Sequence, residues 1–263
     1  MADFEHDTAV HSRGDGSFDC FIAEDWWVIA GPNGGYVAAI VARALQAAAD
    51  GAERPLRSLT VHYLRAPSAG PARVEVELER RGRTVTFASA RLVQAERPCA
   101  LALAVLADSR EGFELEHAAP PAVAPPEEVH EASNRPDPPP VAQQLRFRPV
   151  LEGGAGEALT GGWLRLRRET PLDAALLVAL CDFWLPAAFT VARRPIAVPT
   201  LELTVHLRAR LPRESDWVLG RFVTRTAREG LLEEDAELWS RDGKLLAQSR
   251  QLALALAGSP GAG

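Results

Sequence analysis

The sequence predicts an α+β fold built from two copies of one unit, an antiparallel sheet curved around a buried helix. The first observation is a repeat: Ser58–Arg65 reads SLTVHYLR, and Glu202–Arg208 reads ELTVHLR 144 residues later. The second is that each copy follows a segment that is apolar on nearly every side, which indicates a buried helix. The third is that strand-like segments follow each copy. Repetition of a whole helix-and-sheet unit indicates duplication of one small domain.

In the first unit, the turn cluster Gly31–Gly35 leads into an apolar helix predicted at Tyr36–Gln46. Strands are predicted at Leu59–Leu64, Arg73–Glu79 and Thr84–Gln94. In the second of these strands, valine and leucine alternate with charged residues, which predicts one buried and one solvated face.

In the second unit, Thr170 as cap and Pro171 at the first helical position predict a helix from Leu172 to about Phe183. Strands are predicted at Leu201–Arg208, Trp217–Thr224, Leu232–Ser240 and Leu245–Leu256. The last two are joined by Asp242-Gly243, which is a strong hairpin signal. A helix that is apolar all round needs a sheet curved around it. We therefore predict a double hot-dog fold, with two antiparallel sheets each wrapped around a buried helix.

Residues 118–141 hold eight of the 20 prolines. Proline fixes φ and lacks an amide donor, so we expect this stretch to stay out of sheet interiors and helices. It is predicted to be an extended linker; a ligand for an SH3-type domain is the alternative. The predicted organisation is an N-terminal hot-dog at 1–117, a Pro-rich linker at 118–141, and a C-terminal hot-dog at 142–263 that carries the catalytic residues.

The bulk properties are those of an ordinary globular protein, with 47% hydrophobic and 24% charged residues. The net charge of −6 argues against non-specific binding to nucleic acid or an anionic membrane. No apolar run reaches the ~18 residues that span a bilayer, and the acidic N-terminus does not resemble a signal peptide. Three scattered cysteines predict neither disulfides nor a metal site, and they fit a cytoplasmic protein. We expect no cofactor.

Asp182 is the residue that most indicates chemistry. It lies in the apolar run LLVALCDFWL, and the first unit has no counterpart near Ala38. An unpaired carboxylate there would cost several kcal/mol, so hydrogen bonds or a raised pKa are expected. The alternative is a structural carboxylate near the helix's C-terminal end, where the helix dipole disfavours it. Thr200, at the entrance of the repeated strand, and Gln251, beside small residues, are candidate partners, although each alone could be structural.

At these positions the chain resembles the acyl-CoA thioesterase II family of double hot-dog proteins. The family's helix aspartate matches Asp182 in CDFWLP, its strand threonine matches Thr200 in PTLELTVH, and its strand glutamine matches Gln251 in DGKLLAQSRQ. The resemblance covers most of the chain, because the first half has the same Gly-Gly-led helix. It departs at Glu202 and Leu203, where the family often has Asp-His. The resemblance implies hydrolysis of acyl-CoA by a water that the trio holds and activates.

In that reaction Asp182 would act as general base, while Thr200 and Gln251 fix the water's position. The amides near Gly34 and Gly35, at the N-terminus of the first helix, are candidate donors for the oxyanion. This would place the site between the two units. The expected partner is the acyl-CoA substrate, and a homo-oligomer is possible.

Three other interpretations are open. A non-catalytic acyl-binding or ligand-binding hot-dog protein could carry the same trio as a polar cluster. The repeated histidines His62 and His206 could indicate a hot-dog dehydratase, although their presence in both copies favours a structural role. Cys181 could be a thiol nucleophile, but a free cysteine is usually buried packing. A serine hydrolase would need the motif G-x-S-x-G, which the sequence lacks.

Overall fold

The computed structural model describes residues 2–29, 31–49, 54–133, 137–209 and 216–257. In the first half the strands are β1 (His11–Ser12), β2 (Ser17–Ile22), β3 (Leu56–Tyr63), β4 (Gly70–Arg81), β5 (Val85–Gln94) and β6 (Arg97–Ala107). In the second half they are β7 (Leu145–Glu152), β8 (Ala158–Leu166), β9 (Ile196–Ala197), β10 (Thr200–Leu207), β11 (Val218–Thr224), β12 (Ala227–Arg228), β13 (Leu231–Trp239), β14 (Leu245–Leu254) and β15 (Leu256–Ala257). The α-helices are α1 (Phe4–Asp7), α2 (Gly34–Ala48), α3 (Pro140–Gln143) and α4 (Ala174–Leu180), and the 3-10 helices are η1 (Glu24–Trp26), η2 (Pro126–Glu128) and η3 (Ala187–Thr190).

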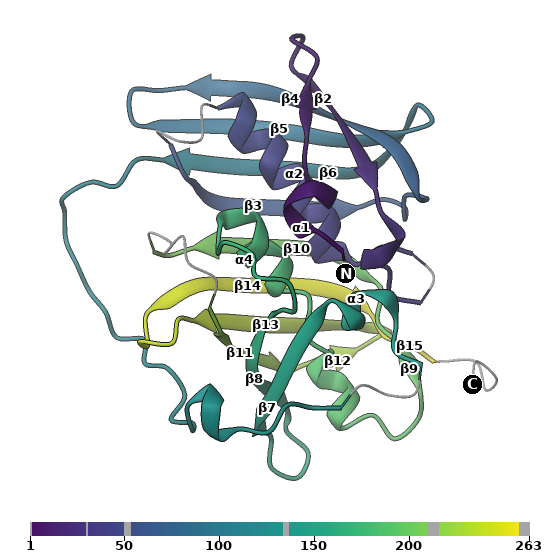
Figure 1. Ribbon diagram of the computed structural model, residues 1–263, viewed down its shortest axis with the longest axis vertical. Coiled ribbons are helices and arrows are strands. Elements are labelled where there is room, and N and C mark those ends of the chain that lie inside the picture. Colours follow the sequence, from purple (N-terminus) through teal and green to yellow (C-terminus); the bar gives the residue numbers. More distant parts are fainter. Residues whose placement is uncertain (1, 30, 50–53, 134–136, 210–215, 258–263) are drawn as a thin grey trace.

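Within the described residues, 13 strands form one sheet in the order β1-β2-β4-β5-β6-β3-β10-β14-β13-β11-β8-β7, with β12 beside β13. The pairings described are all antiparallel. Figure 1 shows β3 and β10 side by side in the middle of the molecule, where the strands of the two halves meet. The halves are thus joined edge to edge, so neither repeated strand leaves an open edge at this junction.

The β3–β10 junction has local two-fold symmetry. The repeat aligns Thr60 with Thr204, and the antiparallel register pairs the same two residues directly. Their hydroxyl oxygens lie 2.9 Å apart. His62 and His206, also equivalent in the repeat, are both exposed on these strands. The duplicated sequence therefore pairs with itself, as an isologous dimer interface would.

The predicted strands of the repeat are confirmed, with ends that differ by a few residues. The hairpin predicted at Asp242-Gly243 joins β13 to β14, and Gly243 has φ 82°, a left-handed conformation that glycine adopts without strain. Alternation along β14 also holds, because Gln251 and Ala253 are buried while Leu252 is exposed.

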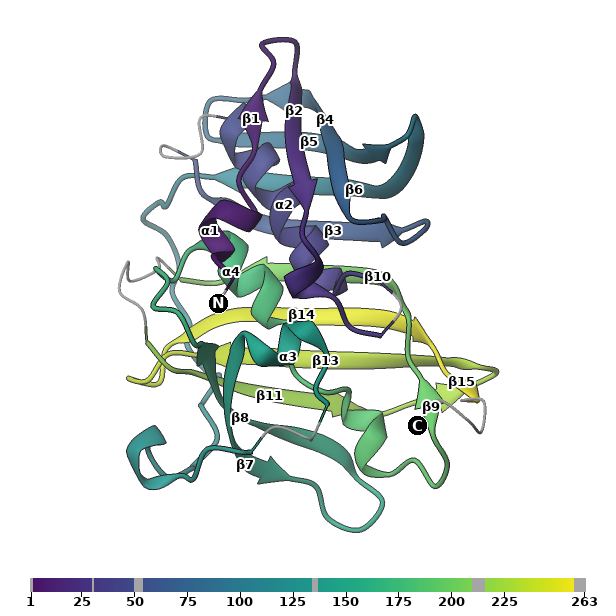
Figure 2. The same ribbon diagram turned by 45° about the vertical axis from the view of Figure 1, so that its right-hand side comes forward.

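The two central helices press against each other. Helix α2 is buried over most of its length and contacts strands β2 to β6, whereas α4 contacts β10 and β14. Figures 1 and 2 show α4 beside the lower end of α2, next to the β3–β10 junction. The approach is so close that a Cβ built on Gly35 would lie 2.6 Å from the carbonyl oxygen of Ala179. Only glycine fits at this crossing.

Helix α4 is shorter than predicted, and the predicted start and end were both wrong. Asp173, not Thr170, is the N-cap, and its side chain accepts a 2.8 Å hydrogen bond from the Leu176 amide. Helix α4 ends at Leu180. The Asp182 amide then donates to the Ala179 carbonyl at 3.0 Å, three residues back, which closes a tighter turn. Asp182 consequently lies just beyond the helix rather than within it.

The Pro-rich stretch is only partly the linker that was predicted. It connects β6 to β7, but it contains η2, and its last two residues begin helix α3. The expectation that no helix forms there was therefore wrong, because proline at the first helical position needs no amide donor. The Ala124 carbonyl also accepts a 2.9 Å hydrogen bond from Trp163, so this part is anchored to the second half. Residues 134–136 lie outside the described residues.

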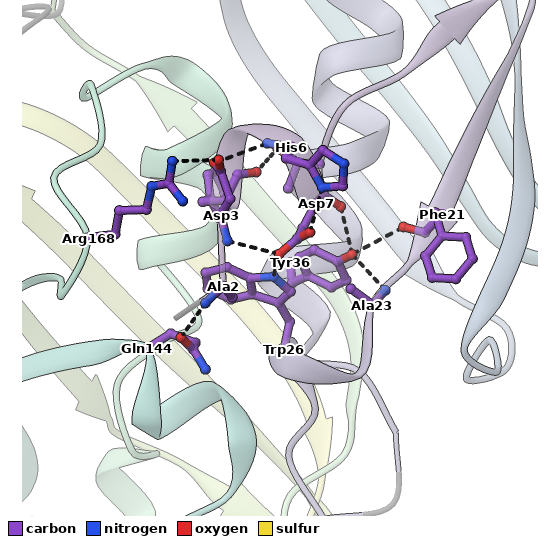
Figure 3. A network of polar contacts seen from close by, with 12 residues as sticks. Ala2, Asp3, His6, Asp7, Phe21, Ala23, Trp26, Tyr36, Gln144 and Arg168 are labelled. Atoms are coloured by element: carbon purple, nitrogen blue, oxygen red, sulfur yellow. Dashed lines mark hydrogen bonds and ion pairs between the residues drawn. The ribbon is translucent and has the colours of Figure 1, made fainter.

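The N-terminal segment joins the two halves on the helix side (Figure 3). The Asp7 carboxylate accepts a 3.0 Å hydrogen bond from the Trp26 indole, and the Tyr36 hydroxyl donates to the Asp7 carbonyl at 2.8 Å. Asp3 forms a 2.9 Å ion pair with Arg168 of the second half. In the described part of the chain, no helix is long and apolar enough to cross a membrane.

The helix crossing makes a stability prediction. Replacing Gly35 with alanine would force the new Cβ against the Ala179 carbonyl and, at 2.9 Å, against the Asp182 Cβ. We expect a loss of about 1–3 kcal/mol, as is usual for overpacking, measured as the free energy of unfolding in urea. The matched control is Gly112→Ala, where a Cβ would meet nothing within 4 Å. Equal stability of the two variants would contradict the close approach.

Candidate functional site

Asp182 faces the N-terminus of α2 from the other half of the chain. Its Oδ2 accepts a 2.8 Å hydrogen bond from the Gly35 amide. Its backbone carbonyl accepts a 2.9 Å hydrogen bond from the Asn33 side chain, whose own Oδ1 caps α2 by accepting from the Tyr36 amide at 3.1 Å. A helix N-terminus carries free amides and partial positive charge, so it favours an ionised carboxylate at this place.

The two glycines lie against Asp182. A Cβ on Gly34 would come within 3.1 Å of Asp182 Oδ2 and 3.2 Å of the Tyr63 ring. The Tyr63 hydroxyl donates to the Gly34 carbonyl at 2.8 Å, which fixes the peptide that starts α2. The Gly35 amide, one of the predicted oxyanion donors, is already bonded to the aspartate. The Gly34 amide also lowers the pKa of this carboxylate, but by less than the Gly35 amide does.

Thr200 and Gln251 meet on adjacent strands, β10 and β14. The Thr200 hydroxyl donates to Gln251 Oε1 at 2.8 Å. The other end of the amide, Nε2, donates to Glu234 Oε1 on β13 at 3.2 Å. Glu234 Oε2 in turn accepts from the backbone amide of Ala187, the first residue of η3. A continuous hydrogen-bond chain therefore runs from Thr200 through Gln251 to Glu234.

Both acids of the site have raised pKa values. Burial raises the pKa of Asp182 to about 6, and hydrogen bonds from Gly35, Gln251, Asn33 and Gly34 limit the rise. Asp182 itself is only partly buried, so its carboxylate is enclosed by protein without being sealed from the surface. Burial likewise raises the pKa of Glu234 to about 7, and the charge of Asp182 adds to that rise. Clustered acids with shifted pKa values are typical of functional sites.

The structure thus brings the five predicted site residues to one region: Asp182, Thr200, Gln251, Gly34 and Gly35. Both glycines face Asp182, and the Gln251 amide lowers the pKa of the aspartate. Phe183, which follows Asp182, stacks on Trp26 with ring centroids 5.8 Å apart, so the chain beside the carboxylate is fixed by aromatic packing.

Asn33 and Glu234 were missed by the sequence analysis. A signal for Glu234 was available, because period-two alternation along β13 places it on the same face as Leu232, Ala236 and Leu238. A charged residue on a buried face is unusual and demands a partner. Asn33 offered a weaker signal, as a good N-cap residue immediately before the helix glycines.

The geometry weighs against two of the other interpretations. His62 and His206 are exposed, whereas the helices and Asp182 lie against the buried side of the same strands. A dehydratase that uses these histidines is therefore not favoured. Cys181 is 1% exposed, and burial raises the pKa of its thiol to about 12. A thiol with that pKa is a poor nucleophile at neutral pH, since the thiolate is the reactive form.

Comparison with known families gives two matches. Residues 23–107 match the family model of the acyl-CoA thioesterase N-terminal domain, and residues 120–255 match that of the acyl-CoA thioesterase C-terminal domain. A search of curated proteins finds no significant match to the chain.

Solved structures give further likenesses. A hot-dog-fold protein of unknown function from Alicyclobacillus acidocaldarius is 28% identical, with a TM-score of 0.88 over 98% of this chain and 99% of the other. A putative thioesterase II from Thermobifida fusca is 27% identical, with a TM-score of 0.85 over 97% and 99%. An acyl-CoA thioesterase II from Mycobacterium marinum shares the fold, with 20% identity and a TM-score of 0.81 over 98% and 99%. These likenesses confirm the hot-dog class of the predicted fold.

The burial of Cys181 makes a prediction about its reactivity. The native protein should react with iodoacetamide at Cys181 far more slowly than the urea-unfolded protein does, because both access and the thiolate fraction are low. Mass spectrometry of labelled peptides measures the rate at each cysteine. The unfolded chain is the control for full reactivity. Labelling of native Cys181 at the unfolded rate would restore the case for a thiol nucleophile.

Proposed function

Because the chain belongs to the acyl-CoA thioesterase family, we propose that it hydrolyses acyl-CoA thioesters to a carboxylic acid and CoA. The observation that carries this proposal is that Asp182 accepts a hydrogen bond from the N-terminus of α2 and is acted on by the Gln251 amide, which is itself bonded to Thr200. We further propose that the fold is a double hot-dog, with units at 1–117 and 142–263 joined by the stretch at 118–141. The site then lies between the units and draws on both.

In the proposed reaction a water molecule is held by Thr200 and Gln251 and attacks the thioester carbonyl carbon. Asp182 removes a proton from this water as the new C–O bond forms. The carbonyl oxygen becomes an oxyanion. When the carbonyl re-forms, the C–S bond breaks, and the proton on Asp182 passes to the departing CoA sulfur. A thioester is electrophilic enough that no nucleophilic side chain is required.

The two glycine amides take different parts in this proposal. Gly35 holds the base, since its amide already donates to Asp182. The Gly34 amide, at the same helix N-terminus, is the proposed donor to the oxyanion, with the partial positive charge of α2 behind it. This division revises the expectation that both amides serve the oxyanion.

The experiment that tests the function is release of free CoA from acyl-CoAs of graded chain length, detected with a thiol reagent. We expect turnover of at least one chain length. Binding of acyl-CoA without release of CoA would instead favour the ligand-binding interpretation, in which the trio is only a polar cluster.

Replacing Asp182 with asparagine should keep the fold and lower kcat by roughly 10²–10⁴-fold, the usual contribution of a positioned base. Thr200→Val and Gln251→Leu should each cost less, because these residues orient the water but do not take its proton. Cys181→Ala, as the control, should change kcat little. Full activity of Asp182→Asn combined with loss in Cys181→Ala would replace water attack by a covalent mechanism.

The rate should depend on pH through Asp182. The base must be ionised, and its pKa is about 6, so kcat/KM should fall as the pH drops below about 6. The stability effect has the opposite direction. A carboxyl pKa raised from 3.8 stabilises the fold fully below 3.8, and this contribution is lost as the pH rises through about 6. Asp182→Asn should therefore melt no lower than the wild type at pH 8, as measured by calorimetry.

A further inference from the structure

Glu234 is a buried carboxylate for which the proposed mechanism has no use. It lies on β13 with 3% of its surface exposed. Oε1 accepts from Gln251 Nε2 at 3.2 Å, and Oε2 accepts from the Ala187 amide. Both oxygens therefore have protein donors. A buried acid that only stabilised the fold would be a costly choice, because apolar side chains of similar volume usually serve as well or better.

The chemistry of a carboxylate decides which way the Gln251 amide points. An ionised carboxylate can only accept hydrogen bonds, so the amide must present its NH2 group to Glu234. Its oxygen is then directed to Thr200, whose hydroxyl donates to it at 2.8 Å. In the reversed orientation two oxygens would face each other at Glu234. An ionised Glu234 thus selects one of the two orientations of the amide.

This orientation of the amide also decides which hydrogen-bonding groups Thr200 and Gln251 can offer to a water molecule. Since the Thr200 proton is directed to Gln251, the hydroxyl's lone pairs remain able to accept. Gln251 keeps a second N–H, and its amide acts on Asp182 by lowering the pKa of that carboxyl. The amide thus offers a donor on the side of Asp182, and the Thr200 hydroxyl next to the amide offers an acceptor, which is what a single water needs if it is to give its proton to Asp182.

We propose that Glu234 is a positioning residue, whose buried carboxylate holds the Gln251 amide in the one orientation that lets Gln251 and Thr200 place the attacking water. The role in placing water rests on the proposed function; the fixed orientation of the amide does not.

The same contact makes the site sensitive to pH. The groups that face Glu234 are Gln251, the Ala187 amide and the carboxylates of Asp182 and Glu233. Asp182 faces Gly34, Gly35, Asn33 and Gln251. The charges of Asp182 and Glu202 both raise the pKa of the Tyr63 hydroxyl. A protonated Glu234 gains an O–H that could donate to the Gln251 amide oxygen. Protonation therefore removes the preference for one orientation of the amide. The ordered form of the site is the one with Glu234 ionised.

The first arm of the test needs no turnover. In a ¹⁵N-labelled protein, the side-chain NH2 signals of Gln251 are those missing from Gln251→Leu. In the wild type they should shift with pH around a midpoint near 7, which is the pKa of Glu234. In Glu234→Gln that transition should vanish, and the remaining response should follow Asp182 near 6. The matched control is Glu237→Gln, on the same strand but paired with Arg221 at 3.6 Å. It should keep the wild-type midpoint.

The second arm is kinetic. Glu234→Gln should lower kcat on the order of 10-fold with little change in KM, as expected for misplacement of a reacting group. The acid side of its pH–rate profile should move from about 7 to about 6, because ionisation of Glu234 no longer contributes to the profile and only that of Asp182 remains. In a Gln251→Leu background, the same substitution should have no further effect on kcat, since Glu234 acts through Gln251. If the carboxylate were purely structural, the losses in kcat from Glu234→Gln and Gln251→Leu would add in the double variant. The acid side of the pH–rate profile would then stay where it is in the wild type.

The outcomes separate this inference from the proposed function. If the wild type releases no CoA from any acyl-CoA while the Gln251 signals behave as described, the hydrolase is wrong and the positioning contact stands. An unchanged Gln251 titration in Glu234→Gln overturns the positioning contact, whatever the activity. Should that variant fail to fold, Glu234→Asp keeps the charge and withdraws the oxygens from Gln251. A folded aspartate variant with wild-type kcat would overturn the proposal as well.

Discussion

The contact between the N-terminus of α2 and Asp182 is the constraint on which the rest of the site depends. It requires α2 and the end of α4 to meet without a side chain between them, and Gly35 provides that space. It also requires Asn33 to hold the Asp182 backbone, so that the carboxylate points at the Gly35 amide. Because these groups come from opposite halves of the chain, neither half alone holds the carboxylate in this way.

The two-fold symmetry of the β3–β10 junction explains how the strands and central helices are arranged. It does not explain which groups each half supplies to the site. Pairing of β3 with β10 places equivalent residues opposite each other at Thr60 and Thr204, and it brings the two central helices together on one side of the sheet. Identical units would present identical groups from both sides. The halves instead differ: one supplies helix amides, and the other supplies Asp182, Thr200, Gln251 and Glu234. Donors and acids are thus divided between the two halves of the chain.

The sequence was most informative where a pattern extends over many residues. Strand alternation, the apolar helices and the repeat itself were read correctly, because periodicity reflects burial directly. The ends of α4 were not, since Asp173 and Thr170 are both acceptable caps and only tertiary packing chooses between them. The Gly35–Asp182 hydrogen bond joins residues 147 positions apart, and no local pattern encodes such a contact. Glu234 could have been found, because alternation puts it on a buried face.

The effect of the two buried acids on stability favours a functional role for them over a role in packing. Asp182 and Glu234 both have raised pKa values, so the folded protein holds protons that the unfolded chain would release. Their contribution to stability is therefore lost as the pH rises through about 6 and about 7, and at neutral pH both acids weaken the fold. Apolar residues would avoid that loss. A base needs a carboxylate that is poised near neutral pH and not fully solvated, and desolvation by the surrounding protein is the physical means of obtaining one.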